Sequence, residues 1–113
     1  MDNVGNILLN GINSFDLDLL PEKFLVHDNY PNPFNPFTTV RYELAVKENV
    51  KVKLIDIMGR TIKSDNYDGM TPGRYAYVWN GTNNFGKPVS TGIYFIQIDA
   101  GHKSAIKKML LLK

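Results

Sequence analysis

Strand-like alternation of side chains is the feature that most constrains how this chain can fold. In residues 38–44, every second side chain is suited to burial, beginning with Thr38 and ending with Leu44, and the positions between are more polar. Similar segments recur about every 8 to 12 residues beyond Lys23, and no stretch sustains the period of an amphipathic helix. The pattern therefore predicts an all-β domain and gives no support for a parallel sheet built from strand–helix–strand units.

Turn residues divide the alternating pattern into about seven strands. The expected strands cover residues 24–27, 38–44, 50–57, 61–63, 74–79, 92–98 and 104–112. Residues 64–73 are rich in Asp, Asn and Gly and are expected to form a loop, while the spacing in residues 104–112 would also fit a short helix. Hairpins and longer connections between such strands predict an immunoglobulin-like β-sandwich of about seven antiparallel strands.

The chain of 113 residues has room for one domain with its own core. Residues 1–20 differ in composition, although Phe15, Leu17 and Leu19 have strand periodicity, and we expect a linker or the tail of a preceding domain there. Pro21 marks the expected boundary, so the predicted domain spans residues 21–113. The net charge of +2 does not favour nucleic-acid binding, no segment has the apolar length of a membrane span, and the N-terminus does not have the pattern of a signal peptide.

Three prolines and two aromatic residues lie within Tyr30–Pro36. Each proline fixes its own φ and pushes the preceding residue out of the helical region, so this segment must be extended or turned. Tyr30 and Phe34 are expected to act as apolar anchors for it. The residues themselves predict a rigid connector between strands and not a catalytic loop.

Neither histidine of the chain lies in a recognisable nucleophile motif. His27 is the last residue of the first expected strand, and His102 lies in an expected turn. No catalytic residue is therefore predicted. Two histidines without any cysteine do not favour a zinc site, and the sequence predicts no metal and no cofactor.

Aromatic residues near the middle of the chain offer one alternative function, the stacking of sugar rings on an exposed surface. The candidates are Tyr75, Tyr77, Trp79 and Phe85. A domain of this size, however, needs most of its aromatic side chains inside, and Trp79 is expected in the core.

Several motifs resemble those of one known family. Tyr30–Pro36 followed by residues 38–42 resembles the opening motif of the type A C-terminal sorting domain of the type IX secretion system. Gly92–Phe95 and residues 107–113 resemble its closing motifs, and Leu54–Arg60 resembles its middle hairpin. Residues 79–94 are also similar to the immunoglobulin-like module of flagellar hook-capping proteins. The resemblance covers about residues 21–113.

This resemblance implies a non-catalytic domain at the end of a longer exported protein of Gram-negative bacteria. The cargo would cross the inner membrane by means of its own signal peptide, and outer-membrane translocon components would recognise the folded domain in the periplasm. In many family members a sortase component cuts ahead of the domain, and in this chain such a cut would fall in the region before Phe24. The upstream cargo domain would then reach the cell surface or the medium. The expected partners are thus the translocon, the sortase and the cargo.

Recognition is expected to involve the residues that carry the motifs. They are Tyr30, Pro31, Asn32, Pro33, Phe34, Asn35, Pro36, Gly59, Gly92, Tyr94, Lys107, Lys108 and Lys113. The last strand, over residues 104–113, is the preferred surface, because an edge strand can pair with a strand of a receptor. The opening motif is either recognised by the receptor or holds the first strand in place, and a mostly structural role is favoured.

The rival interpretation is an accessory immunoglobulin-like module that stays in an extracellular protein and binds a carbohydrate or a protein partner. The position of the last expected strand, directly before Lys113, favours the sorting signal. Deletion of residues 104–113 would separate the two interpretations, because it would stop export in the first case and weaken ligand binding in the second.

Overall fold

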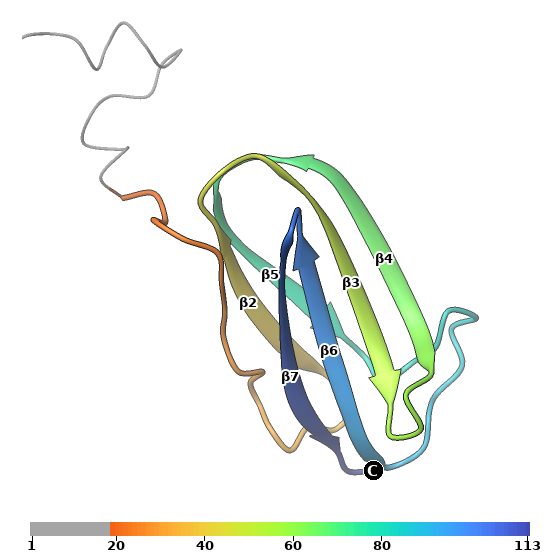
Figure 1. The fold of residues 1–113 in the computed structure, drawn as a ribbon. Coiled ribbons are helices and arrows are strands. Elements are labelled where there is room, and N and C mark those ends of the chain that lie inside the picture. The colour runs from red at the N-terminus through yellow and green to blue at the C-terminus, as the bar shows by residue number, and fades with distance from the viewer. Residues whose placement is uncertain (1–18) are drawn as a thin grey trace, which may run out of the picture.

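The structure is a computed structural model that describes residues 19–113, so the predicted linker over residues 1–20 lies almost entirely outside the described residues. The described chain forms seven strands and two β-sheets, which lie face to face (Figure 1). This is the predicted immunoglobulin-like β-sandwich. No helix in the described residues is long and apolar enough to cross a membrane.

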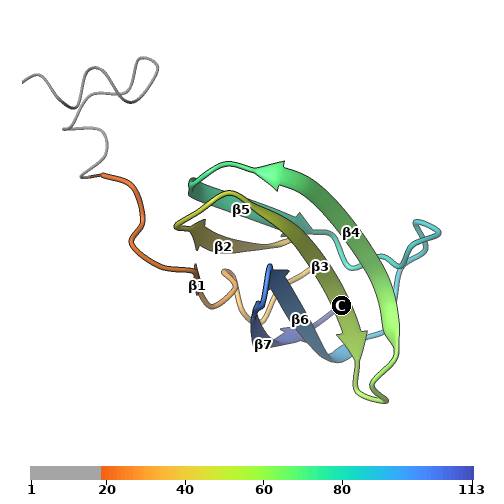
Figure 2. The ribbon, with the colours of Figure 1, turned by 45° about the horizontal axis from the view of Figure 1, so that its top comes forward.

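All pairs of neighbouring strands are antiparallel. One sheet has three strands and the other has four, and the two sheets are packed as layers (Figure 2). The strands are β1 (Leu25–Val26), β2 (Thr38–Leu44), β3 (Glu48–Asp56), β4 (Thr61–Met70), β5 (Gly73–Trp79), β6 (Gly92–Ala100) and β7 (Lys103–Leu111). The smaller sheet has the order β1-β2-β5, and the larger has the order β4-β3-β6-β7. Strands β4 and β7 are therefore the two edges of the larger sheet.

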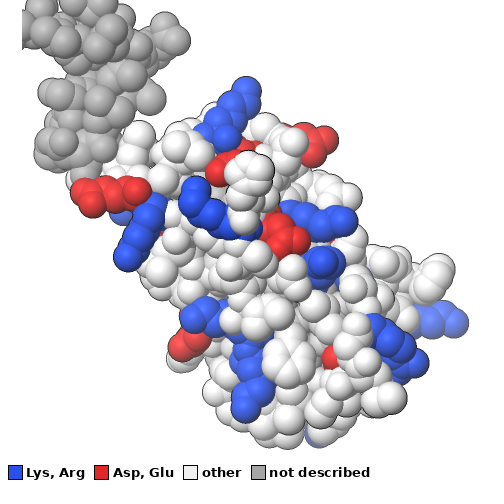
Figure 3. Space-filling view, in the orientation of Figure 1, with Lys and Arg blue, Asp and Glu red and all other residues white. Residues whose placement is uncertain are grey.

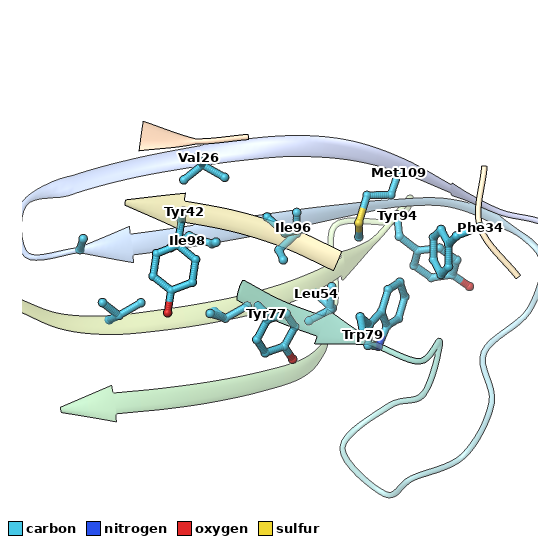
Figure 4. Close-up of a cluster of buried hydrophobic side chains, with 14 of the residues drawn as sticks. Val26, Phe34, Tyr42, Leu54, Tyr77, Trp79, Tyr94, Ile96, Ile98 and Met109 are labelled. Atoms are coloured by element: carbon cyan, nitrogen blue, oxygen red, sulfur yellow. The ribbon is translucent and has the colours of Figure 1, made fainter. Parts of the chain in front are cut away.

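The alternating pattern explains the core. In β2, Thr38, Val40, Tyr42 and Leu44 are buried, and the residues between them face away from the core. Side chains from both sheets meet between the layers, and Ile96 of β6 is fully buried among them (Figure 4). Burial of apolar surface of this kind is the main force that holds the two sheets together.

The prediction of a loop over residues 64–73 is wrong. Strand β4 continues to Met70, and β5 begins at Gly73. Polar side chains are tolerated in β4 because it is an edge strand with most of its side chains partly or fully exposed. Its backbone pairs with β3, as in the pair Val52 and Asp65, so the strand does not depend on apolar side chains.

Residues 103–111 form strand β7, and not the short helix that their spacing would also fit. The strand pairs with β6 along its whole length, from Lys103 opposite Ala100 to Leu111 opposite Gly92. Met109 and Leu111 are buried on its inner side. The sequence spacing fits either a strand or a short helix, and hydrogen bonding to the central strand β6 favours the strand.

One buried hydroxyl connects the sheets near β4. The Tyr77 hydroxyl donates a hydrogen bond of 2.6 Å to Oδ2 of Asp65. Burial of the phenol, and then the hydrogen bond and charge of Asp65, raise the pKa of Tyr77 above its ordinary value. The phenol is therefore neutral at physiological pH and acts as a donor from the small sheet to the large one.

Candidate functional site

The motifs from separate parts of the chain lie together at one end of the sandwich. We call this end, made of residues 31–36, 56–60, 90–94 and 110–113, the motif end. Strand β3 enters its hairpin here, β6 begins here and β7 ends here (Figure 1). Three hydrogen bonds and an aromatic cluster hold the opening motif against the closing motifs, as described below.

The opening motif binds the free edge of β7. The N–H of Leu110 donates to Oδ1 of Asn32 at 3.0 Å, and the C=O of Leu110 accepts from the N–H of Phe34 at 2.9 Å. The N–H of Leu112 then donates to the C=O of Phe34 at 3.0 Å. These bonds make a short parallel bridge between Phe34 and Leu111. The proline-rich segment thus covers one end of an otherwise open strand edge.

Three aromatic rings pack together behind this bridge (Figure 4). The centroids of Phe34 and Trp79 are 5.5 Å apart, and those of Trp79 and Tyr94 are 5.4 Å apart with an edge-to-face geometry. The polar atoms of the two larger rings are satisfied, because Trp79 Nε1 donates to the C=O of Thr82 and the Tyr94 hydroxyl donates to the C=O of Ser90. Phe34 is therefore an anchor, as predicted, and Trp79 lies in the core.

A pair of buried polar residues holds the start of the opening motif. Asn29 Nδ2 donates to Oγ1 of Thr38 at 2.9 Å, and the Thr38 hydroxyl donates to the C=O of Pro31 at 2.8 Å. Both side chains are almost fully buried. Asn29 Oδ1 has no hydrogen-bond partner among the described residues. This pair was not predicted from the sequence, although asparagine is a common turn residue whose side chain can bond its own backbone two residues on, as Asn29 Nδ2 does with the C=O of Pro31.

The hairpin between β3 and β4 is organised by Asp56. Its Oδ1 accepts from the N–H groups of Met58 and Arg60, and its Oδ2 accepts from Nε of Arg60 at 2.8 Å. The backbone hydrogen bond from Arg60, with further bonds and the positive charge of that residue, lowers the pKa of Asp56. Gly59 has a φ of +85°, a conformation that residues with a Cβ rarely adopt. The role of Asp56, like that of the Asn29 and Thr38 pair, was not predicted from the sequence.

A small hollow separates this hairpin from the start of β6. Its volume is about 160 Å³, and its lining includes Met58, Thr91 and Gly92. The Met58 side chain is 75% exposed beside it. The N–H of Lys113 donates to Oγ1 of Thr91, so the end of the last strand is held at the same place. The motif end therefore presents a shallow surface with exposed apolar and basic side chains.

The lysines of β7 extend this surface along the strand. Lys107 Nζ lies 3.3 Å from Oδ1 of Asp28, which belongs to the segment between β1 and the opening motif. Lys108 is exposed, and it forms no ion pair within the described residues. Figure 3 shows basic side chains, a smaller number of acidic ones and uncharged surface on the face formed by the larger sheet. This surface would attract an acidic partner.

The structure brings most of the predicted recognition residues together but gives them different roles. Exposed at the motif end are Pro31, Asn32, Pro33, Asn35, Pro36, Gly59 and Lys113. Phe34 and Tyr94 are buried, so they support this surface from below, and Gly92 is half-buried. The prediction that Tyr30 is an apolar anchor is wrong, because its backbone pairs with Thr39 while its side chain is 75% exposed.

The residues considered for catalysis and for sugar binding do not come together at one site. His27 Nε2 lies 3.0 Å from Oε2 of Glu43 in a hollow of about 340 Å³, whose lining includes no serine, threonine or cysteine in the described part of the chain. The proposed sugar-stacking surface is not formed, because Tyr77 and Trp79 are buried in the core. Phe85 is exposed in a loop. The described residues hold no group of side chains suited to a metal ion.

Solved structures show where this fold occurs. Latent PorU from Porphyromonas gingivalis is 19% identical with a TM-score of 0.58, over 79% of this chain and 9% of that one. PorZ from the same organism, a surface component of the type IX secretion system, is 23% identical with a TM-score of 0.53, over 80% and 11%. FlgD from Xanthomonas campestris, a hook-capping protein, is 16% identical with a TM-score of 0.55, over 81% and 69%. These identities support a shared fold alone.

The fold thus defines a class of small immunoglobulin-like modules that occur in larger secretion proteins and in hook-capping proteins. The chain spans only about a tenth of the PorU and PorZ chains that it matches. The sequence profile of the secretion system C-terminal sorting domain matches residues 28–112. The chain belongs to this family, whose members are non-catalytic C-terminal signals for type IX secretion. No curated protein matches the sequence.

Proposed function

We propose that residues 21–113 form a non-catalytic sorting signal that directs an upstream cargo through the outer membrane by the type IX secretion system. Outer-membrane translocon components recognise the folded domain in the periplasm. A sortase component then separates the cargo by a cut before Phe24, and the cargo reaches the cell surface or the medium. The domain needs no cofactor for this role.

The observation that carries this proposal is the joining of the opening and closing motifs at the motif end. Asn32 and Phe34 bind the backbone of Leu110 and Leu112, although they lie far apart in the sequence. Only the folded chain therefore presents these segments as one surface. A receptor that contacts the motif end and the adjoining part of β7 would distinguish a folded domain from an unfolded one.

An export assay tests the function. Residues 21–113 are fused behind a signal peptide and a fluorescent reporter, in a host with a working type IX system and in its translocon-deficient mutant. The proposal expects the reporter outside the competent cells and inside the periplasm of the mutant. A closely similar native domain of the host, fused to the same reporter, serves as the positive control.

Two other outcomes would overturn the proposal. Reporter trapped in the periplasm of both strains, while the control domain is exported, would favour an accessory immunoglobulin-like module. Reporter outside both strains would show that its release does not depend on the translocon.

A further inference from the structure

The outer edge of β7 is covered at one end and open along the rest. Its covered end is Leu110, whose N–H and C=O bind Asn32 and Phe34 and therefore point away from β6. In an antiparallel strand, the backbone groups of alternate residues point to the same side. Those of Ser104, Ile106 and Lys108 thus also point outward. No hydrogen bond within residues 19–113 reaches these outward groups.

The side chains of this open segment, Lys103–Lys108, have a definite pattern. Ile106 is 56% exposed and Lys108 is exposed, and both lie on the outer face of the larger sheet. Lys107 lies on the other side, with Asp28. A strand added here would meet an apolar side chain at Ile106 and positive charges at the two positions that follow.

The other sheet edges of the described chain do not combine a long run of free backbone groups with positive charge. Strand β1 has two residues, and β5 contains one charged side chain, Arg74. On β4, Asn84 occupies the outward groups of Ile62 and Ser64, because its N–H donates to the C=O of Ile62 and its Oδ1 accepts from the N–H of Ser64. The open segment of β7 combines free backbone groups with a cluster of lysines.

A second copy of the chain does not suit this edge. Two β7 strands paired side by side would bring their lysines onto one ladder, where like charges repel. An acidic segment would instead gain backbone hydrogen bonds and favourable charge pairs. Charge complementarity therefore identifies the kind of partner.

We propose that the open segment of β7 accepts an extended acidic segment of the export machinery as an additional strand. The backbone groups of Ser104, Ile106 and Lys108 form the ladder. An apolar side chain of the partner lies beside Ile106, and carboxylates lie beside Lys107 and Lys108. This proposal rests on the sorting function proposed above.

Single prolines in the reporter fusion test the strand addition. Ile106→Pro removes one outward N–H without removing a hydrogen bond to β6, and such a position tolerates proline. Asn66→Pro is the matched control, because Asn66 lies two residues beyond Ser64 on the edge of β4, so its N–H also points outward. Ile106→Ala controls for loss of the side chain. We expect Ile106→Pro to lower export about tenfold, Ile106→Ala to lower it by less because only the side-chain contact is lost, and Asn66→Pro to export normally.

Charge is tested separately with Lys108→Glu and Lys108→Arg. Lys108→Glu should lower export about tenfold, and Lys108→Arg, which keeps the positive charge, should export like the unmodified fusion. Thermal unfolding of each purified fusion establishes that the variants are folded, and Ser104→Pro replaces Ile106→Pro if the latter unfolds. Normal export of a folded proline variant, or of Lys108→Glu, would overturn the strand addition. Failure of the unmodified fusion would instead reject the sorting function itself.

Discussion

At the scale of single residues, Phe34 has the largest role in the opening motif. Its ring packs against Trp79, and its backbone forms two hydrogen bonds, one to Leu110 of β7 and one to Leu112 just beyond the strand. Its side chain is 2% exposed, whereas Tyr30 of the same motif is largely in solvent. Two aromatic residues four positions apart therefore have opposite environments.

Phe34→Ala should destabilise the domain by about 3–5 kcal/mol, because it removes a fully buried ring and leaves a cavity. Tyr30→Ala should change the free energy of unfolding by no more than about 0.5 kcal/mol. Chemical denaturation of the two variants measures both values. Equal losses of stability would contradict the assignment of Phe34 as the buried anchor.

Asp56 gives the domain a defined response to acid. Its lowered pKa means that the ionised carboxylate stabilises the folded hairpin, fully above the unfolded pKa of about 4 and progressively less as the pH falls through the folded value. Asp56→Asn cannot make this contribution. The stability difference between the two proteins should therefore shrink below pH of about 4 in unfolding experiments. A difference that stays constant down to the folded pKa would contradict this account.

At the scale of elements, the contact between the opening motif and β7 determines how much of that edge is free. Asn32 supplies a side-chain acceptor to one N–H of the strand. The neighbouring residue Met109 pairs with Tyr94 of β6 and is buried. The two amides therefore depend on different partners.

Asn32→Ala should speed amide hydrogen exchange at Leu110 and leave exchange at Met109 nearly unchanged. The loss of one hydrogen bond, worth about 1 kcal/mol, corresponds to roughly a fivefold faster exchange. Asn35→Ala is the matched control, because Asn35 is exposed in the same motif. Equal acceleration at both amides would indicate general loosening of β7 and would argue against a specific cap.

Sequence patterns predicted the strands whose side chains alternate between core and solvent, as in β2. They failed in β4, where backbone pairing with β3 holds polar residues such as Asp65 in a strand. They also could not assign different environments to Tyr30 and Phe34, because both are aromatic and the difference depends on the path of the chain. The contact of Asn32 with Leu110 joins residues 78 positions apart, so no local pattern could predict it.

At the scale of the whole molecule, β3 joins two turns that lie at opposite ends of the sandwich (Figure 1). The turn after β3 belongs to the motif end and exposes Met58. The turn before β3 exposes Val46, which is 51% accessible. These two residues form a matched pair, because each is an exposed apolar side chain in a turn that adjoins β3.

The central claim is that the type IX machinery recognises the folded domain at its motif end. The most direct test is the exported fraction of the reporter fusion carrying Met58→Glu compared with that carrying Val46→Glu, after thermal unfolding has shown both to be folded. We predict that Met58→Glu lowers export about tenfold and that Val46→Glu exports like the unmodified fusion. Equal export of the two variants would contradict recognition at the motif end.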